Sequence, residues 1–301
     1  MNSHSYISNP KNEDIFININ GELLHRRNAK ISVFDSGFLL GDGVWEGIRL
    51  HKSKLVFIEN HLDRLYASAK GISLNISLSK QNLIDEIDKV LNKNKMYNDV
   101  HIRLVVSRGD KITPYQNPNA NVGPINFVII PEYKKTDPNT YIKGITIGRV
   151  PNVRPDNSIL SPHYNTLSKL NCILASVEAN KLGYDEGIMN DMNGYVSTCN
   201  STNLFFIKND KVLTSTGDYC LNGITRSKAI SICNDNQIEC SETNFKFEDI
   251  NDCNEAFVTG TFAGIIPVSK LENRKLESTN SDSIVNKIRI HYNKLIQDYI
   301  E

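Results

Sequence analysis

Charge of one sign and long hydrophobic runs are both missing from this sequence. Lys and Arg together number 34 among the 301 residues, and Asp and Glu together also number 34. The chain therefore has no overall field that would attract nucleic acid or an anionic membrane. No apolar run is long enough to span a bilayer, and the first twelve residues are polar, unlike a signal peptide. These absences predict a soluble, cytoplasmic protein with neither a nucleic-acid nor a membrane partner.

Closely spaced cysteines and histidines are missing as well. The six cysteines are scattered without a Cys-x-x-Cys pair, so neither a zinc frame nor a disulfide framework is indicated. The seven histidines form neither His-x-x-x-His nor His-Glu-x-x-His, so the sequence predicts no metal site. Six unpaired thiols are typical of a protein in a reducing compartment.

Short alternating apolar segments separated by turn signals fill the first half of the chain. Asn20-Gly21 is a strong hairpin signal, and Ser79 is a good N-cap for an amphipathic helix. The elements predicted here are a hairpin within 14–33, a loop at 34–42, strands at 44–50 and 55–58, helices at 60–71 and 79–92, and strands at 101–107 and 125–131.

The second half is organised around the stretch from Pro162 to Gly183. An amphipathic helix capped by Asn165 or Thr166 is predicted there from four apolar residues at helical spacing: Leu167, Leu170, Leu174 and Val177. The other elements predicted in this half are a strand near 145, hairpins turning at 193–194 and 209–210, a helix from 225, a strand at 255–259 and a last helix over 285–299.

Hairpins in groups, with helices between the groups, predict an α+β fold rather than a doubly wound sheet. A chain of 301 residues is long enough for two domains, each with its own core. The polar run at residues 134–142 is the expected linker. It divides a smaller N-terminal domain, residues 1–133, from a larger C-terminal domain, residues 143–301.

Five segments of the chain carry motifs of one known family. They are Ser32 to Arg49, which includes Gly43-Val44-Trp45-Glu46-Gly47; His61-Leu62-Asp63-Arg64-Leu65; Pro162 to Ile188; Asn222-Gly223-Ile224-Thr225-Arg226; and Thr259-Gly260-Thr261-Phe262-Ala263. Through these segments the chain resembles the class IV (fold-type IV) pyridoxal-phosphate enzymes over nearly its whole length. The family includes the branched-chain and D-amino acid aminotransferases and aminodeoxychorismate lyase. The resemblance implies the two-domain fold-type IV architecture, pyridoxal 5′-phosphate bound between the domains, and at least a homodimer.

An anion site is predicted where Gly223 precedes a helix, because the first turn of a helix leaves backbone N–H groups unpaired. Thr225 and Thr261 each offer a hydroxyl, and Arg64 offers a charge-assisted fork. Taken singly, these residues fit an ordinary capped helix and a solvent-facing arginine equally well. The resemblance implies that together they hold the cofactor phosphate, with a cup made of Arg64, Gly223, Ile224, Thr225, Gly260 and Thr261.

The Schiff-base lysine of the family falls on Asn165 when the motif is aligned without gaps. Lys169 is the replacement candidate, because on a helix it would lie one turn later, about 6 Å along the axis, with its stem leaning back. A solvent-exposed helical lysine is the ordinary alternative. The glutamate that the family places at the pyridine nitrogen falls on Thr198. A threonine can hydrogen-bond a ring nitrogen but cannot hold it protonated as a carboxylate does.

The substrate side is predicted from four further residues. Arg103 matches a family position that could meet a substrate carboxylate, and an arginine paired on a strand face is the alternative. The resemblance also assigns Trp45, Phe262 and Ala263 to this side. It implies an aminotransferase for an amino acid and a 2-oxo acid, of the branched-chain or D-amino acid type.

Two other functions stay open because both Asn165 and Thr198 depart from the family pattern. One is a repurposed member that binds pyridoxal phosphate or another anion without transamination. The other is a lyase similar to aminodeoxychorismate lyase.

Overall fold

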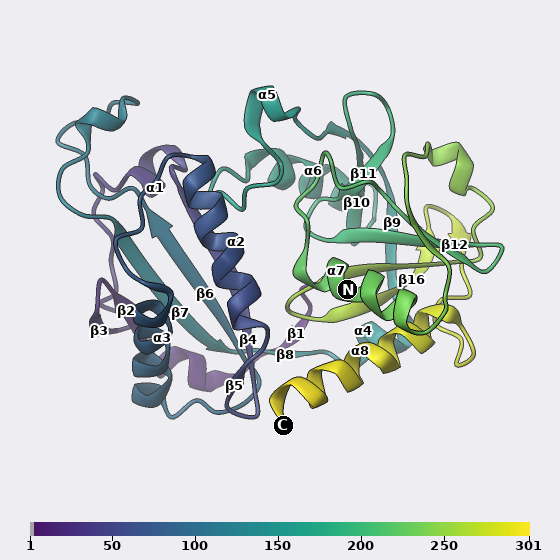
Figure 1. The fold of residues 1–301 in the computed structure, drawn as a ribbon, viewed down its shortest axis with the longest axis horizontal. Helices are drawn as coiled ribbons and strands as arrows, with labels where there is room; N and C mark the ends of the chain where they lie inside the picture. The colour runs from purple at the N-terminus through teal and green to yellow at the C-terminus, as the bar shows by residue number, and fades with distance from the viewer. Residues whose placement is uncertain (1–2) are drawn as a thin grey trace.

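Two β-sheets, each covered by helices, form the protein (Figure 1). The structure is a computed structural model and describes residues 3–301. One sheet has six strands in the order β3-β2-β7-β6-β4-β5, all paired antiparallel. The other has nine strands; eight follow the order β11-β10-β9-β16-β15-β12-β13-β14, and β17 pairs with β16. In this mixed sheet, β9 runs parallel to both of its neighbours.

The six-stranded sheet buries one face against α2 and α3. Alternate residues of β6, from Val100 to Val106, are at most 1% exposed, as expected for a strand with one face in the core. The hairpin at Asn20-Gly21 is confirmed, and both residues have the positive φ that such a turn requires. The elements of this half are β2 Phe16–Ile19, β3 Glu22–His25, β4 Gly43–His51, β5 Lys54–Leu55, α2 Ile58–Gly71, α3 Lys80–Asn94, β6 Val100–Ser107 and β7 Asn126–Tyr133, with short helices η1 Pro10–Asp14, α1 Ser36–Leu40 and η2 Pro118–Ala120.

Two predictions for this half were wrong in detail. The loop expected at 34–42 contains α1, because the Asp35 side chain accepts from Phe38 N and caps the turn. Helix α2 begins at Ile58 rather than at an Asn60 cap, after Phe57 in the left-handed region. Phe57 is 5% exposed, so its packing in the core, which no local signal reveals, sets the start of this helix.

The nine-stranded sheet packs against α7 and α8 on one face. Both predicted hairpins, β10–β11 and β12–β13, are confirmed. No helix among residues 3–301 is long and apolar enough to cross a membrane. The elements are β9 Ile145–Val153, α5 Asn157–Leu160, α6 Leu170–Lys181, β10 Glu186–Asn190, β11 Val196–Cys199, β12 Asn203–Lys208, β13 Lys211–Thr214, α7 Ile224–Asp235, β14 Cys240–Glu242, η3 Phe247–Ile250, β15 Glu255–Gly260, β16 Gly264–Leu271, β17 Arg274–Lys275 and α8 Ile284–Ile300.

The stretch between the two sheets is more ordered than a plain linker. Within residues 134–142, β8 (Lys135–Thr136) pairs with β1 (Tyr6–Ile7), and α4 (Asn139–Lys143) begins. Figure 1 shows β1 and β8 in the gap between the two halves of the molecule. The division of the chain into domains at residues 134–142 stays a prediction.

Helix α6 begins later than predicted, and this changes the place of Lys169. The backbone of Thr166 pairs with Val44 on β4, and Leu167 N donates to Gly43 O at 2.9 Å. These bonds keep the chain extended up to the helix, so neither Asn165 nor Thr166 is its N-cap. Lys169 is the N-cap residue, with φ −108°. It does not lie one helical turn after Asn165, and that part of the prediction was wrong.

Candidate active site

The N-terminus of α7 presents backbone N–H groups without a side-chain cap. Its N-cap is Gly223, and the buried residues Ile224 and Thr225 form the first turn. A Cβ at position 223 would lie 2.2 Å from Oδ1 of Asn203, so only glycine fits between this helix and β12. The uncapped positive end of a twelve-residue helix is the geometry of an anion site.

Arg64 reaches this helix end from the other half of the molecule. Its NH1 group donates to Asn222 O, one residue before the N-cap, at 3.3 Å. Its Nε and NH2 groups both donate to Glu46 at 2.8 Å, a bidentate pair. The structure therefore brings Arg64 of α2, a predicted phosphate-binding residue, next to the loop that leads into α7.

Glu46 is a fully buried carboxylate beneath the arginine. Besides the Arg64 fork, it accepts a hydrogen bond from Nδ1 of His61 at 2.7 Å. Burial by itself raises the pKa of Glu46, but the charge and hydrogen bonds of Arg64 and the hydrogen bond of His61 outweigh it and hold the pKa below its usual value. The carboxylate is thus ionised and fixed in place.

The turn after β15 forms another edge of this region. Gly260 pairs with Gly264 across it, and Phe262 and Ala263 are buried in the turn. Asn203, opposite Thr259 in the sheet, donates to Leu221 O at 2.9 Å and so ties the strand beside this turn to the loop before α7. Thr261 is half-buried in the turn, and its contact with a phosphate stays a prediction.

Lys169 points toward Trp45 on β4. Its Nζ atom lies 5.7 Å from the centre of the Trp45 ring, and the Arg103 guanidinium lies over the same ring at 3.7 Å. Burial, with the charges of Arg154 and Arg64, lowers the pKa of Lys169 to about 8, although Cys172 and Glu46 oppose this shift. About a tenth of the amine is therefore uncharged at pH 7, far more than for a lysine with the ordinary pKa of 10.5.

Asn165, which the motif alignment places at the family's lysine position, links the two halves of the molecule. Its side-chain amide donates to Trp45 O at 2.7 Å, and Trp45 N donates to Asn165 O at 3.0 Å. Asn165 N donates to Ser68 Oγ at 3.0 Å. The residue is 2% exposed, and its Oδ1 atom has no hydrogen-bond partner within residues 3–301. In this protein the position is a buried clamp on β4.

Thr198 is buried on β11, and its hydroxyl is already engaged. It donates to Thr202 O at 2.7 Å, so only the lone pairs of its oxygen remain for a ligand. Thr202 in turn donates from its own hydroxyl to Glu186, a buried carboxylate. The contact of Thr198 with a ring nitrogen stays a prediction, and the hydroxyl could serve there only as an acceptor.

Two of the predicted substrate-side residues, Trp45 and Arg103, lie on one face of β4 and β6. Trp45 and Gly47 share this face of β4, and Arg103 lies opposite Gly47 on β6. His101 packs edge-on against Phe262, with ring centres 5.8 Å apart. Burial, with the nearby charges of Lys134 and Arg103, lowers the pKa of His101 to about 3, so its ring is neutral at physiological pH. This face therefore offers aromatic walls and one exposed arginine.

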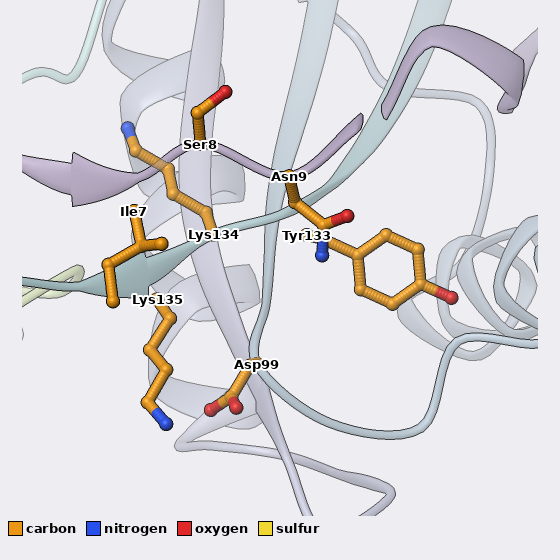
Figure 2. Close-up of a pocket in the computed structure, with 7 residues that line it drawn as sticks. All are labelled: Ile7, Ser8, Asn9, Asp99, Tyr133, Lys134 and Lys135. Carbon is orange, nitrogen blue, oxygen red and sulfur yellow. The ribbon is translucent and has the colours of Figure 1, made fainter. Parts of the chain in front are cut away.

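A pocket beside the N-terminal segment adjoins this face through Lys134, whose Nζ atom lies 4.5 Å from the centre of the Phe262 ring (Figure 2). It is formed by residues next to β1 and the end of β7, including Asn9, Tyr133 and Asp99. None of the predicted site residues lines it. Figure 2 shows Lys134 and Lys135 at its edge pointing in different directions, so no convergent polar site is formed there.

Three residues that position this site were missed by the sequence prediction. Glu46 and His61 lie inside the family motifs, but nothing local shows that Glu46 binds Arg64 or that His61 binds Glu46. Asn203 follows Thr202 in a strand motif, and its contact with the loop before α7 spans 18 residues of sequence.

Fold and site together define a class IV aminotransferase scaffold. The family model described as amino-transferase class IV matches residues 43–271, and the chain belongs to this family. Among solved structures, the branched-chain aminotransferase of Thermoproteus uzoniensis in complex with norvaline is 27% identical, with a TM-score of 0.84 and 95% of each chain covered. The Escherichia coli branched-chain aminotransferase is 26% identical, with a TM-score of 0.86, 94% of this chain and 95% of that chain covered. These likenesses confirm the fold-type IV architecture.

Curated relatives carry related names. The putative branched-chain-amino-acid aminotransferase of Methanocaldococcus jannaschii is 34% identical over 91% of this chain and 93% of its own length. The D-alanine aminotransferase of Listeria monocytogenes is 31% identical over 84% of this chain and 86% of its own length. Branched-chain-amino-acid aminotransferase-like protein 2 of Arabidopsis thaliana is 34% identical over 95% of this chain. The chain spans about half the length of the Arabidopsis relatives it matches, 51% and 52%.

Proposed function

We propose that the protein is a pyridoxal-phosphate-dependent aminotransferase that acts on an amino acid and a 2-oxo acid. The observation that carries this proposal is the lysine that accompanies the anion cup. Lys169 is partly buried, and Arg64 is one of the charges that lower its pKa to about 8. A cofactor that combines a phosphate with an aldehyde needs both groups within one site.

The residues present fit this cofactor at its phosphate and its aldehyde. Arg64 and the first turn of α7 would hold the phosphate, with Thr225 and Thr261 as further donors. Lys169 would supply the amine, since its lowered pKa makes it a nucleophile near neutral pH. The fit at the ring nitrogen is weaker, because Thr198 has already committed its hydroxyl hydrogen.

Each of these residues has a distinct task in the reaction. When bound, pyridoxal phosphate supplies the carbonyl that condenses with amines and the ring that withdraws electrons. Lys169 Nζ would receive and return the proton that moves during transamination. Trp45 and Phe262 would exclude water from the substrate side, and Arg103 would bind the substrate carboxylate.

The substrate proposal is an amino acid with an apolar side chain, of the branched-chain type. The aromatic walls at Trp45 and Phe262 and the neutral ring of His101 support an apolar substrate side. The names of the Methanocaldococcus and Escherichia coli proteins agree with this class. The six free cysteines support a reducing, cytoplasmic location.

Borohydride reduction after incubation with pyridoxal phosphate, followed by peptide mass spectrometry, tests the proposal. The expected result is a pyridoxyl adduct on Lys169, absent from Lys169→Ala and retained by Lys181→Ala, a matched control at an exposed, ion-paired lysine of α6. Adduct formation with conversion of amino acids would establish the proposed activity.

A second function is favoured by one observation. Asn165 is locked to Trp45 at the family's lysine position, as a residue with a purely structural task would be. The protein would then bind pyridoxal phosphate or another anion without transamination. Phosphate-competitive binding with no adduct on any lysine would support this function and contradict the aminotransferase.

We also propose that the protein is a homodimer that pairs through α6. This helix buries only Ala175 and Ala179 and exposes large apolar side chains instead, the reverse of an ordinary surface helix. The exposed residues are Leu170, Ile173, Leu174 and Val177. Light scattering on Ile173→Glu/Leu174→Glu is expected to give a monomer. A single change at an isolated apolar residue on α8, Ile290→Glu, is expected to leave the dimer intact, and a monomeric wild-type protein would contradict the proposal.

A further inference from the structure

We infer that Glu46, supported by His61, is a positioning residue that sets which edge of the Arg64 guanidinium faces the cofactor phosphate. This inference rests on the proposed function, because it concerns how the cup would bind that phosphate. Glu46 itself does not touch the ligand. It acts only through Arg64. The hydrogen bonds within the triad of Glu46, His61 and Arg64 define how.

The arginine has few donors left after it binds the carboxylate. A guanidinium carries five N–H bonds. Glu46 takes one from Nε and one from NH2 at 2.8 Å each, and Asn222 O takes one from NH1 at 3.3 Å. One hydrogen on NH1 and one on NH2 remain. The fork on Glu46 therefore turns this pair of donors toward the space beside the α7 N-terminus.

His61 fixes the carboxylate in turn. It lies one turn before Arg64 on α2, so both side chains lean toward the same strand. Because a carboxylate only accepts hydrogen bonds, Nδ1 of His61 must carry the hydrogen in the 2.7 Å contact. The other ring nitrogen has no hydrogen-bond partner in the described part of the chain.

Burial makes this triad rigid. The side chains of Glu46 and His61 are 0% and 1% exposed, and that of Arg64 is 17% exposed. A guanidinium held on a fully buried carboxylate cannot swing out to solvent without leaving that charge unpaired. The cup is therefore preorganised before any phosphate arrives, and ligand binding does not have to order a long flexible side chain.

The test compares ligands that carry a phosphate with one that does not. For Glu46→Gln, the dissociation constants of pyridoxal 5′-phosphate and of inorganic phosphate are expected to rise about tenfold, since the amide offers one acceptor where the carboxylate offered two. Binding of phosphate-free pyridoxal is expected to change less than twofold. Glu255→Gln is the matched control, because Glu255 accepts two backbone N–H bonds at the start of α8, away from the cup.

Equal weakening for pyridoxal and its phosphate would overturn the inference, since it would show a general structural role. So would wild-type affinity in Glu46→Gln. If that variant does not fold, His61→Asn is used instead; its amide can still donate to Glu46, and a smaller loss confined to the phosphorylated ligands is expected.

A double-mutant cycle separates aiming of the fork from the charge alone. In an Arg64→Lys background, which keeps the charge but has no fork, Glu46→Gln is expected to change phosphate affinity less than twofold. If the effects of Arg64→Lys and Glu46→Gln on phosphate affinity multiplied in the double variant, the inference would be overturned. If the wild-type protein binds pyridoxal phosphate and these variants bind it equally well, the inference about Glu46 fails but the proposed function stands. If the wild-type protein binds no phosphate, both the inference and the proposed function fail.

Discussion

The anion cup and the lysine side of the same site differ in what they are built from. The cup consists of a helix N-terminus with a glycine cap, and of an arginine fixed by a buried carboxylate. The proposed lysine side depends on single side chains, and the motif alignment places Asn165 and Thr198 where the family resemblance implies a lysine and a glutamate. Backbone features persist as long as the fold does, whereas one substitution removes a catalytic side chain and leaves the fold intact.

The difference also shows where new chemistry can arise. Residues 166 and 167 are held on β4 by backbone bonds, and we propose that a lysine at the helix start serves the region that a lysine at position 165 would have served. Position 165 clamps the strand, and Lys169 takes the partly buried place beside Trp45.

The largest effect is expected from a substitution that removes part of the anion cup and leaves the lysine side of the site intact. Arg64→Ala removes two donors to the phosphate, each worth about 1.5–3 kcal/mol as charge-assisted bonds. The dissociation constants of inorganic phosphate and of pyridoxal phosphate, measured by fluorescence quenching or calorimetry, are expected to rise at least about 100-fold. Arg103→Ala, on the Trp45 face, is the control and should leave phosphate affinity nearly unchanged. An equal loss in both variants would contradict the separation of the two regions.

A smaller effect is expected from restoring the family's lysine. Asn165→Lys breaks the hydrogen bond to Trp45 O and introduces an ammonium group where the residue is 2% exposed. The free energy of unfolding, from denaturant titration, should fall by about 1–3 kcal/mol.

The control for Asn165→Lys is Asn180→Lys, at an exposed position of α6. Its free energy of unfolding should lie within about 0.5 kcal/mol of the wild-type value. If Asn165→Lys kept full stability and the pyridoxyl adduct moved to position 165, the clamp interpretation would be wrong.

The smallest effect is a shift in pH dependence. Because the pKa of Lys169 is lowered to about 8, adduct formation should rise with pH and level off above about 8. Arg154→Ala removes one of the charges that lower this pKa, so the midpoint should move upward.

The same shift affects stability. The unfolded chain binds a proton at Lys169 up to pH 10.5 and the folded one only up to about 8, so the free energy of unfolding should rise across that window. The pKa of Lys169 itself is measured from the rates of borohydride-trapped adduct formation between pH 6 and 10. A rate that does not vary over this range would contradict the assigned pKa.

Several parts of the fold could be predicted because their signals are local. Asn20-Gly21 has the backbone freedom for a hairpin turn, and Ser79 caps α3 through Asn82 N, as its sequence position indicates. Gly223 before an apolar-polar helical segment marked the start of α7. The partners of Arg64 could not be predicted in this way. His61 and Arg64 share one helix, but Glu46 comes from a strand 15 and 18 residues earlier.

The sequence by itself determined the family of this protein and predicted the anion cup, because both depend on residue type and short spacing. The tertiary structure alone decided where Lys169 lies, which donors Arg64 keeps free and that the large apolar side chains of α6 face outward. Each of these depends on bonds or packing between segments far apart in the chain, and β4 contributes to the first two through Val44 and Glu46. The spacing of apolar residues predicted the helix α6, but only the pairing of residue 166 with β4 shows where this helix begins.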